Sequence, residues 1–233
     1  MRLKKLVKTL LGASTFMTLA GCSFVHAGEQ VEETQRIERD DADQLKMEIE
    51  MGVGELTLAT GSEDWLEGSF LYPENFLTPE LSYQDGTITL SQTEGKKKFL
   101  NNQKSEWDVL LTNQIPVDLA LQTWAAESKL DLKEAWLQNL SIEAGVGELT
   151  VDLSGDYEES FDATIETGVG ESTVYLPEDT GVKITVEKGI GDIETDGLLK
   201  SGDSWVNEAY DSSGPRIHIN AEMGVGDLAF IVK

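Results

Sequence analysis

The chain has 233 residues, and its 43 Asp and Glu outnumber its 18 Lys and Arg, which gives a formal net charge of −25. A field of this sign repels the phosphates of nucleic acids and anionic lipid headgroups, so the composition excludes a nucleic-acid-binding protein. The sequence contains one cysteine, which rules out an intramolecular disulfide framework.

The N-terminus has the pattern of an export signal. Four cations within the first eight residues precede an apolar run from Leu10 to Ala20. This run is about half the ~20 residues that a membrane-spanning helix needs, and its order is typical of a signal peptide that is removed. We predict a signal peptide over residues 1–21. Its removal leaves 14 of the 18 cations against 43 acids, a net charge of −29.

The sequence Leu19-Ala20-Gly21-Cys22 resembles the lipobox of bacterial lipoproteins, in which a cysteine follows the cleavage site. The thiol takes a diacylglyceryl group, and the new amine can take a further fatty acid such as palmitate. Two or three acyl chains anchor a protein stably, whereas one does not. We therefore predict lipidation of Cys22 and a location on the extracytoplasmic face of the cell membrane. The alternative is an ordinary signal peptide that happens to precede a free thiol.

Two segments follow the lipobox before the repeats begin. Residues 22–43 are polar and acidic, and they predict a flexible tether. Strict alternation of apolar and polar residues starts near Gln44, and it predicts an N-terminal β subdomain over residues 44–122. Within it, Asp85-Gly86 between two alternating runs predicts a β-hairpin with a primed turn. Lys96 to Lys98, the basic cluster of the mature chain, are expected in a solvated loop.

A tetrad of the form Gly-(Val/Ile)-Gly-(Glu/Asp) recurs along the chain, with a degenerate copy at Trp124-Ala125-Ala126-Glu127. From that copy onward, successive steps of 21, 23 and 21 residues are typical of solenoid coils. We predict a C-terminal β-solenoid over residues 123–233, with its coils stacked in sequence order. The tetrad glycines are Gly52 and Gly54, Gly145 and Gly147, Gly168 and Gly170, Gly189 and Gly191, and Gly224 and Gly226.

Each tetrad changes the phase of the apolar residues. Leu140 and Ile142 alternate before one copy, and Leu149 and Val151 resume one residue out of step after it. In a straight strand this shift would turn later side chains to the wrong face. The glycines therefore predict corners that join two short strands around one core. A phosphate-binding loop is the alternative, but a strand pattern and an acid follow each tetrad.

The acid of each tetrad falls on the outward phase of its strand. Glu148, Glu171, Asp192 and Asp227 would then form a ladder on the surface. We interpret this ladder as a solvated face that opposes self-association. The same four residues are weak candidates for calcium binding, although the calcium-binding nonapeptide of β-rolls is not reproduced. No other metal site and no cofactor is predicted.

Catalytic chemistry has little support in the sequence. The two histidines, His26 and His218, are far apart, and no nucleophile, base and orienting group can be assigned together. Carboxylate pairs could serve a polysaccharide-active enzyme, but 43 acids make such pairs unspecific. The five tryptophans are expected in the core or in caps, with a sugar-stacking platform as the alternative. We predict a protein that is not an enzyme.

The segment from Leu130-Asp131-Leu132 through Leu140 to Leu153 resembles the toast-rack family of bacterial envelope proteins, as does the region 52–92. The resemblance implies an all-β fold of stacked, β-helix-like coils, a single-stranded β-solenoid after a smaller β subdomain. It extends to the C-terminal part of Lia-type proteins, which regulate the response to cell-wall antibiotics. It implies no specific activity, because fold does not determine function.

These observations together predict a lipid-anchored envelope protein with an interaction or scaffolding role. The resemblance adds an expected role in the envelope stress response. Its expected partners are the membrane, through the lipid, and an envelope protein or a cell-wall polymer. The alternatives are a polysaccharide-binding or polysaccharide-active β-helix protein and a calcium-dependent adhesin.

The lipobox makes the first testable prediction. Cys22→Ala removes the thiol that would carry the lipid, so we expect an unprocessed protein that takes up no fatty-acid label. Metabolic labelling with an alkynyl fatty acid, followed by detergent partitioning, measures this. A mutant that still labels and enters the detergent phase would show that the lipobox interpretation is wrong.

Overall fold

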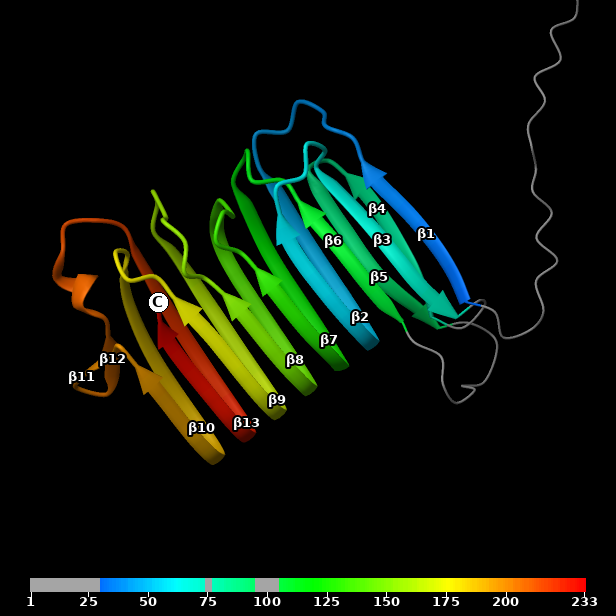
Figure 1. Cartoon of the computed structure of the whole chain (residues 1–233). Helices are drawn as coiled ribbons and strands as arrows, with labels where there is room; N and C mark the ends of the chain where they lie inside the picture. The colour runs from blue at the N-terminus through cyan, green and yellow to red at the C-terminus, as the bar shows by residue number, and fades with distance from the viewer. Residues whose placement is uncertain (1–29, 74–76, 95–104) are drawn as a thin grey trace, which may run out of the picture.

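The computed structural model describes residues 30–73, 77–94 and 105–233, and within them it is almost entirely β-structure (Figure 1). Cys22, His26 and Lys96 to Lys98 lie outside the described residues. The predicted all-β fold is confirmed. The strands are β1 (Gln30–Ile37), β2 (Leu45–Thr60), β3 (Leu66–Pro73), β4 (Leu77–Gln84), β5 (Thr87–Glu94), β6 (Glu106–Leu111), β7 (Val117–Asp131), β8 (Leu137–Asp152), β9 (Phe161–Leu176), β10 (Gly181–Asp196), β11 (Leu199–Ser201), β12 (Ser204–Val206) and β13 (Arg216–Val232), with a 3-10 helix η1 (Glu208–Asp211) between β12 and β13.

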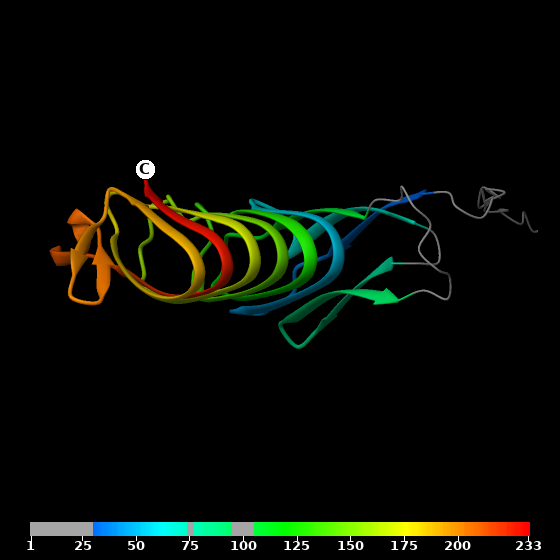
Figure 2. The same cartoon turned by 90° about the horizontal axis from the view of Figure 1, so that it is seen from below.

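Six long parallel strands form the body of the molecule, in the order β2, β7, β8, β9, β13, β10. Each is 15 to 17 residues long, and each makes one rung of the stack. Figure 2 shows that every rung bends back on itself, so that its two limbs face each other. The predicted pair of short strands is therefore one continuous strand in each rung.

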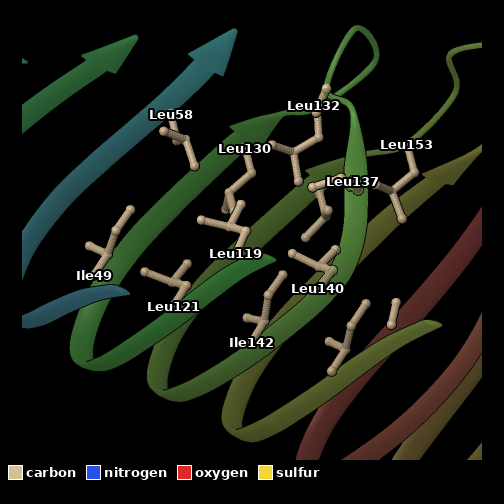
Figure 3. Close-up of a cluster of buried hydrophobic side chains, with 14 of the residues drawn as sticks. Ile49, Leu58, Leu119, Leu121, Leu130, Leu132, Leu137, Leu140, Ile142 and Leu153 are labelled. Carbon is tan, nitrogen blue, oxygen red and sulfur yellow. The ribbon is translucent and has the colours of Figure 1, made fainter. Parts of the chain in front are cut away.

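The core lies between the two limbs of the rungs. In β8, Leu140 and Ile142 of the first limb and Leu149 and Val151 of the second are all at most 2% exposed. These pairs are out of phase in sequence, so only a bend at the tetrad lets both limbs face one core. Figure 3 shows the same arrangement in β7, where Leu119 and Leu121 of one limb lie near Leu130 of the other. One apolar cluster runs through the whole stack.

The last strand of the chain does not take the last place in the stack. β13 lies between β9 and β10 and pairs in parallel with both along nearly its full length (Figure 1). The expected order of coils is therefore wrong, and Gly226 belongs to an interior rung. β9, β10 and β13 carry closely similar tetrads, so the local sequence pattern fits either order of these rungs.

A buried asparagine secures the end of the stack near this insertion. The Asn207 side chain accepts a hydrogen bond from the Val182 amide at 2.8 Å and donates to the carbonyls of Pro177 and Thr180 at 3.0 and 2.7 Å. These groups belong to the β9–β10 connection and to the start of β10. The strand β12 covers only Lys183 to Thr185 of β10, so it leaves nearby backbone groups without a strand partner. The Asn207 side chain supplies the hydrogen bonds that these buried groups need.

The predicted N-terminal subdomain is not separate from the solenoid. Its strand β2 is the first rung, which pairs with β7, and the proposed boundary at 122/123 falls inside β7. On its other side β2 pairs with β5 along the first limb and with β6 along the second. The predicted hairpin is confirmed as β4 and β5, and Asp85 and Gly86 both have positive φ, as the primed turn requires.

The predicted tether over residues 22–43 is wrong for its C-terminal part. Residues 30–37 form β1, which pairs antiparallel with β3 and half-buries every second residue. Asp40 then accepts hydrogen bonds from the Tyr83 hydroxyl at 2.7 Å and the Trp65 indole at 3.0 Å. These bonds hold the pKa of Asp40 below its usual value. Only pairing with a distant strand makes this polar segment ordered.

The interior place of β13 predicts that Gly226→Val and Gly147→Val destabilise the protein to a similar degree. The Cβ added by Gly226→Val would overlap the carbonyl oxygen of Gly170 in the neighbouring rung, and that added by Gly147→Val would overlap the carbonyl oxygen of Ala126. Gly226 and Gly147 also both have a positive φ, which valine rarely adopts. We expect each to cost more than about 3 kcal/mol of unfolding free energy. Gly214→Ala, where the added carbon has only ordinary contacts, is the control. A much smaller loss at Gly226 in chemical denaturation would contradict the interior position.

At the bend of the first rung, β2, the Gln92 side chain of β5 makes the backbone hydrogen bonds that a further rung would make. Its Oε1 accepts hydrogen bonds from the amides of Gly52 and Val53, both at 2.9 Å, and its Nε2 donates to the carbonyl of Val53. We expect Gln92→Ala to cost about 1–3 kcal/mol, because these backbone groups lose their partner. The exposed Gln84→Ala is the control. Equal melting temperatures for the two variants would contradict this role.

Candidate functional site

The bends of the six rungs form a continuous surface along one side of the stack. Equivalent residues of neighbouring rungs lie in register, so each position of the tetrad makes a row that crosses the strands. Figure 2 shows these bends aligned from β2 to β10. The surface carries a glycine row, an apolar row, a second glycine row and an acid row, in chain order.

The stacking of the backbones explains why glycine occurs in both glycine rows. A Cβ on Gly168 would overlap the carbonyl oxygen of Gly145, and one on Gly170 would overlap that of Gly147. The third tetrad position also has φ between 136° and 148°, which residues with a side chain rarely adopt. In the five rungs other than β7, which has Trp124 and Ala126 at these positions, glycine relieves a close approach of neighbouring backbones or side chains and, at the second row, also fits the backbone conformation.

The apolar residue of each tetrad points outward. We call Val53, Val146, Val169, Val225 and Ile190 the apolar row, which Ala125 of β7 completes. Their exposed fractions are 40, 56, 49, 46 and 74%, in that order. In sequence they share the phase of buried residues such as Ile142, and the bend turns them away from the core. Sequence reasoning missed this row for that reason.

Two rows of carboxylates flank these positions. The first acid row, two residues before the tetrad, was not predicted and contains Glu143, Glu166, Glu222 and Glu187. The second acid row contains the predicted Glu148, Glu171, Asp227 and Asp192, all exposed and paired in register. Neighbouring strands are ~4.8 Å apart, and like charges in direct opposition are destabilising. The surface therefore carries a strong local negative potential.

Among the described residues, few cations compensate this potential at the bends. Lys129 lies beside the second acid row, with its ammonium 2.7 Å from Glu127. The hydrogen bond to Glu127 raises the pKa of Lys129, and the charges of Glu127, Glu55 and Glu148 raise it further. Lys188 of the last rung donates a hydrogen bond to the carbonyl of Gly191 at 3.0 Å. One lysine thus interacts with several carboxylates, as a cation on this surface is expected to do.

An open groove runs across five rungs along the first glycine row. It has a volume of about 590 Å³ and extends from β7 to β10. We call it the glycine groove. Its lining comprises the first glycine row, the first acid row with Gln122, and the residues between them; Trp124 closes its β7 end. Trp124 is 66% exposed, whereas the equivalent position in the neighbouring rungs is glycine.

The tryptophans divide between core and surface. Trp65 and Trp107 are buried, as predicted, and Trp107 packs edge-on against Phe70 with ring centroids 5.7 Å apart. For Trp124 and Trp136 the expected core or cap position is wrong, since both are exposed. Trp136 lines a separate cavity of about 270 Å³, together with Tyr157, Glu134, Asp156, Glu158 and Glu159. The two exposed tryptophans therefore do not form one platform.

The other predicted groups do not assemble into a reactive centre. The four weak calcium candidates lie side by side as a row, and in the described parts of the chain no three His, Cys, Asp or Glu side chains converge to hold a metal ion. His218 lies on the exposed face of β13, with its Nδ1 3.3 Å from Asp162. Within the same described ranges, no helix is long and apolar enough to cross a membrane.

Comparison with solved structures finds a candidate cell adhesion protein from Clostridium sporogenes, at 34% identity and a TM-score of 0.80. The match covers 88% of this chain and 100% of that one. Candidate adhesins from Bacteroides fragilis (14% identity, TM-score 0.34, 87% of this chain and 97% of that one) and Parabacteroides merdae (12%, 0.27, 87% and 96%) are more distant. No curated protein matches the chain.

The family model for the N-terminal domain of toast_rack (DUF2154) matches residues 26–175, which are more than half of the chain. This agrees with the stacked, bent rungs and with the resemblance found in the sequence. The chain belongs to the toast-rack family.

Proposed function

We propose that this protein is a non-enzymatic adhesion protein of the cell surface, which binds its partner along the bends of its rungs. The observation that carries the proposal is the apolar row, a line of exposed Val and Ile across the stack in which Ala125 stands at β7. Contiguous exposed apolar surface rimmed by polar residues is characteristic of interaction sites. The 34% identical relative described as a candidate cell adhesion protein supports it.

The rungs did not have to expose these side chains to fold. The glycine rows meet the steric demand of the bend, and a polar residue could occupy the position between them without entering the core. Val146, Val169 and Val225 instead repeat the same β-branched residue in three successive rungs of the stack. Valine suits a strand and its in-register neighbours stabilise the sheet, and the exposure of the whole row also makes it available to a partner.

We further propose that lipid on Cys22 holds this domain close to the membrane. Because β1 begins at Gln30, the link from Cys22 is much shorter than the predicted tether of residues 22–43. Eight residue steps span at most about 30 Å when fully extended. The β1 end of the stack would then lie within that distance of the bilayer. Cell-surface attachment by lipid suits an adhesion role.

A role in the envelope stress response remains a prediction from the resemblance to Lia-type proteins. Expression of a cell-wall stress reporter in a deletion strain, with and without a cell-wall antibiotic, tests it. We expect deletion to change the reporter response. An unchanged response would leave adhesion as the sole proposed role.

Polysaccharide binding is a second candidate function, favoured by the cavity at Trp136. There an indole, 40% exposed, is surrounded by carboxylates, and its Nε1 donates to Glu159 at 3.3 Å. An exposed aromatic face with hydrogen-bonding groups around it suits a sugar ring. This cavity shares no lining residue with the glycine groove, so mutations can separate the two functions.

The adhesion proposal predicts the effect of charge on the apolar row. Val169→Asp with Val225→Asp should reduce attachment of the bacteria to the level of the deletion strain, because two charges enter the middle of the row. Attached cells are counted after washing, and surface protein is measured by immunoblot. Leu110→Asp with Leu199→Asp, also exposed apolar residues but outside the row, should leave attachment unchanged. Equal attachment by the deletion and wild-type strains would exclude an adhesive role.

A further inference from the structure

We propose that the glycine groove and the adjoining apolar row bind a basic, extended segment of a partner polypeptide, in which cationic and apolar side chains alternate. This rests on the proposed adhesive function and names the chemistry of its partner. The shape of the groove, its apolar side and its charge support the proposal.

The shape of the groove fits an extended chain. The first glycine row forms a floor without side chains across four rungs, β8 to β10, and with Trp124 of β7 the groove crosses five rungs in register. Four strand spacings of ~4.8 Å give a length of about 19 Å. A polypeptide in extended conformation rises ~3.3 Å per residue, so about six residues fill this length. A compact ligand would contact only part of such a floor.

The two sides of the glycine row differ in chemistry. On one side lies the first acid row, and on the other the apolar row directly follows each glycine in the chain. Successive side chains of an extended strand point to opposite sides. A strand lying along the floor with alternating cationic and apolar residues would therefore face carboxylates with one set and Val or Ile with the other. Trp124 at the β7 end adds an aromatic face for an apolar or cationic side chain.

The charge of the groove selects the sign of the partner. Its first acid row places Glu143, Glu166, Glu222 and Glu187 in consecutive rungs, and Lys188 is the one cation among the described residues that line it. Gln122 donates a hydrogen bond to Glu143 at 3.0 Å, which shows that this row accepts N–H donors. Lysine or arginine side chains of a partner would relieve the repulsion between neighbouring carboxylates.

Isothermal titration calorimetry with defined peptides tests this chemistry. The protein is the mature chain with Cys22→Ser, and the probe is an octapeptide of alternating Lys and Leu. We expect saturable binding with one site and an affinity at least tenfold weaker in 0.5 M salt, because salt screens charge pairs. A tetrapeptide of the same pattern should bind at least tenfold more weakly, since it covers only part of the groove that extends to Trp124. A Glu-Leu octapeptide should not bind.

Two sets of substitutions locate the site. The affinity for the Lys-Leu octapeptide should fall at least tenfold, equivalent to ~1.4 kcal/mol, when Glu143→Gln, Glu166→Gln and Glu222→Gln are combined. The control removes the same charge elsewhere, with Glu178→Gln, Asp203→Asn and Glu208→Gln, and should change affinity less than twofold. The affinity for the Lys-Leu octapeptide should fall tenfold when Val146→Ser, Val169→Ser and Val225→Ser are combined, whereas the affinity for octalysine should change little. Unchanged melting temperatures show that each variant is folded.

Several results would overturn the proposal. Equal weakening by the control charge set would mean that the peptide follows the net charge and not the groove. Calcium-dependent binding that EDTA abolishes would indicate a metal-bridged surface, and binding of soluble wall glycan without binding of any peptide would indicate a polysaccharide site. Association of two copies, lost in the groove variants, would make a second copy the occupant. If the valine variants lose cell attachment although no peptide binds, adhesion stands and only the proposed partner chemistry fails.

Discussion

Close parallel stacking of bent strands is the constraint on which the structure depends. Each rung must reverse direction within a few residues while it keeps hydrogen-bonding register with its neighbours. At the bend the backbones approach so closely that a Cβ at Gly145, Gly147, Gly168 or Gly170 would overlap a carbonyl of the adjacent rung. Glycine therefore recurs there for steric reasons, and the rows of the bend surface follow from this requirement.

The same geometry separates the functional surface from the core. The limbs bury alternating Leu, Ile and Val between them, while the bend turns Val169 and its equivalents outward. Residues at the same position of the bend then lie beside one another in neighbouring rungs, so a residue type that recurs at one position forms a continuous row. Apolar and acidic rows arise in this way without any single rung forming a site. Repeat architectures in general present such extended surfaces.

The ends of the stack show how the open rungs are completed. At the first rung, the amide of Gln92 takes the place of a neighbouring backbone, and β5 and β6 each cover one limb. At the other end, β12 covers only Lys183 to Thr185 of β10, and Asn207 satisfies the adjacent backbone groups. Insertion of β13 between β9 and β10 gives the C-terminal strand two partners. The terminal segments of the described chain, β1 and β13, are thus both paired within the sheet.

The all-β fold, the repeating bend and the β4–β5 hairpin follow from the sequence alone, because alternation, glycine spacing and Asp85-Gly86 act over a few residues. The sequence also placed the second acid row outside, since Glu148 and its equivalents follow the outward phase. The place of β13, the pairing of β1 and the exposure of the apolar row are set by the three-dimensional fold. Strand order and β1 pairing depend on contacts between distant residues, and the similar tetrads of β9, β10 and β13 fit more than one order of rungs. The valines keep the sequence phase of buried residues, and the three-dimensional bend alone turns them to the surface.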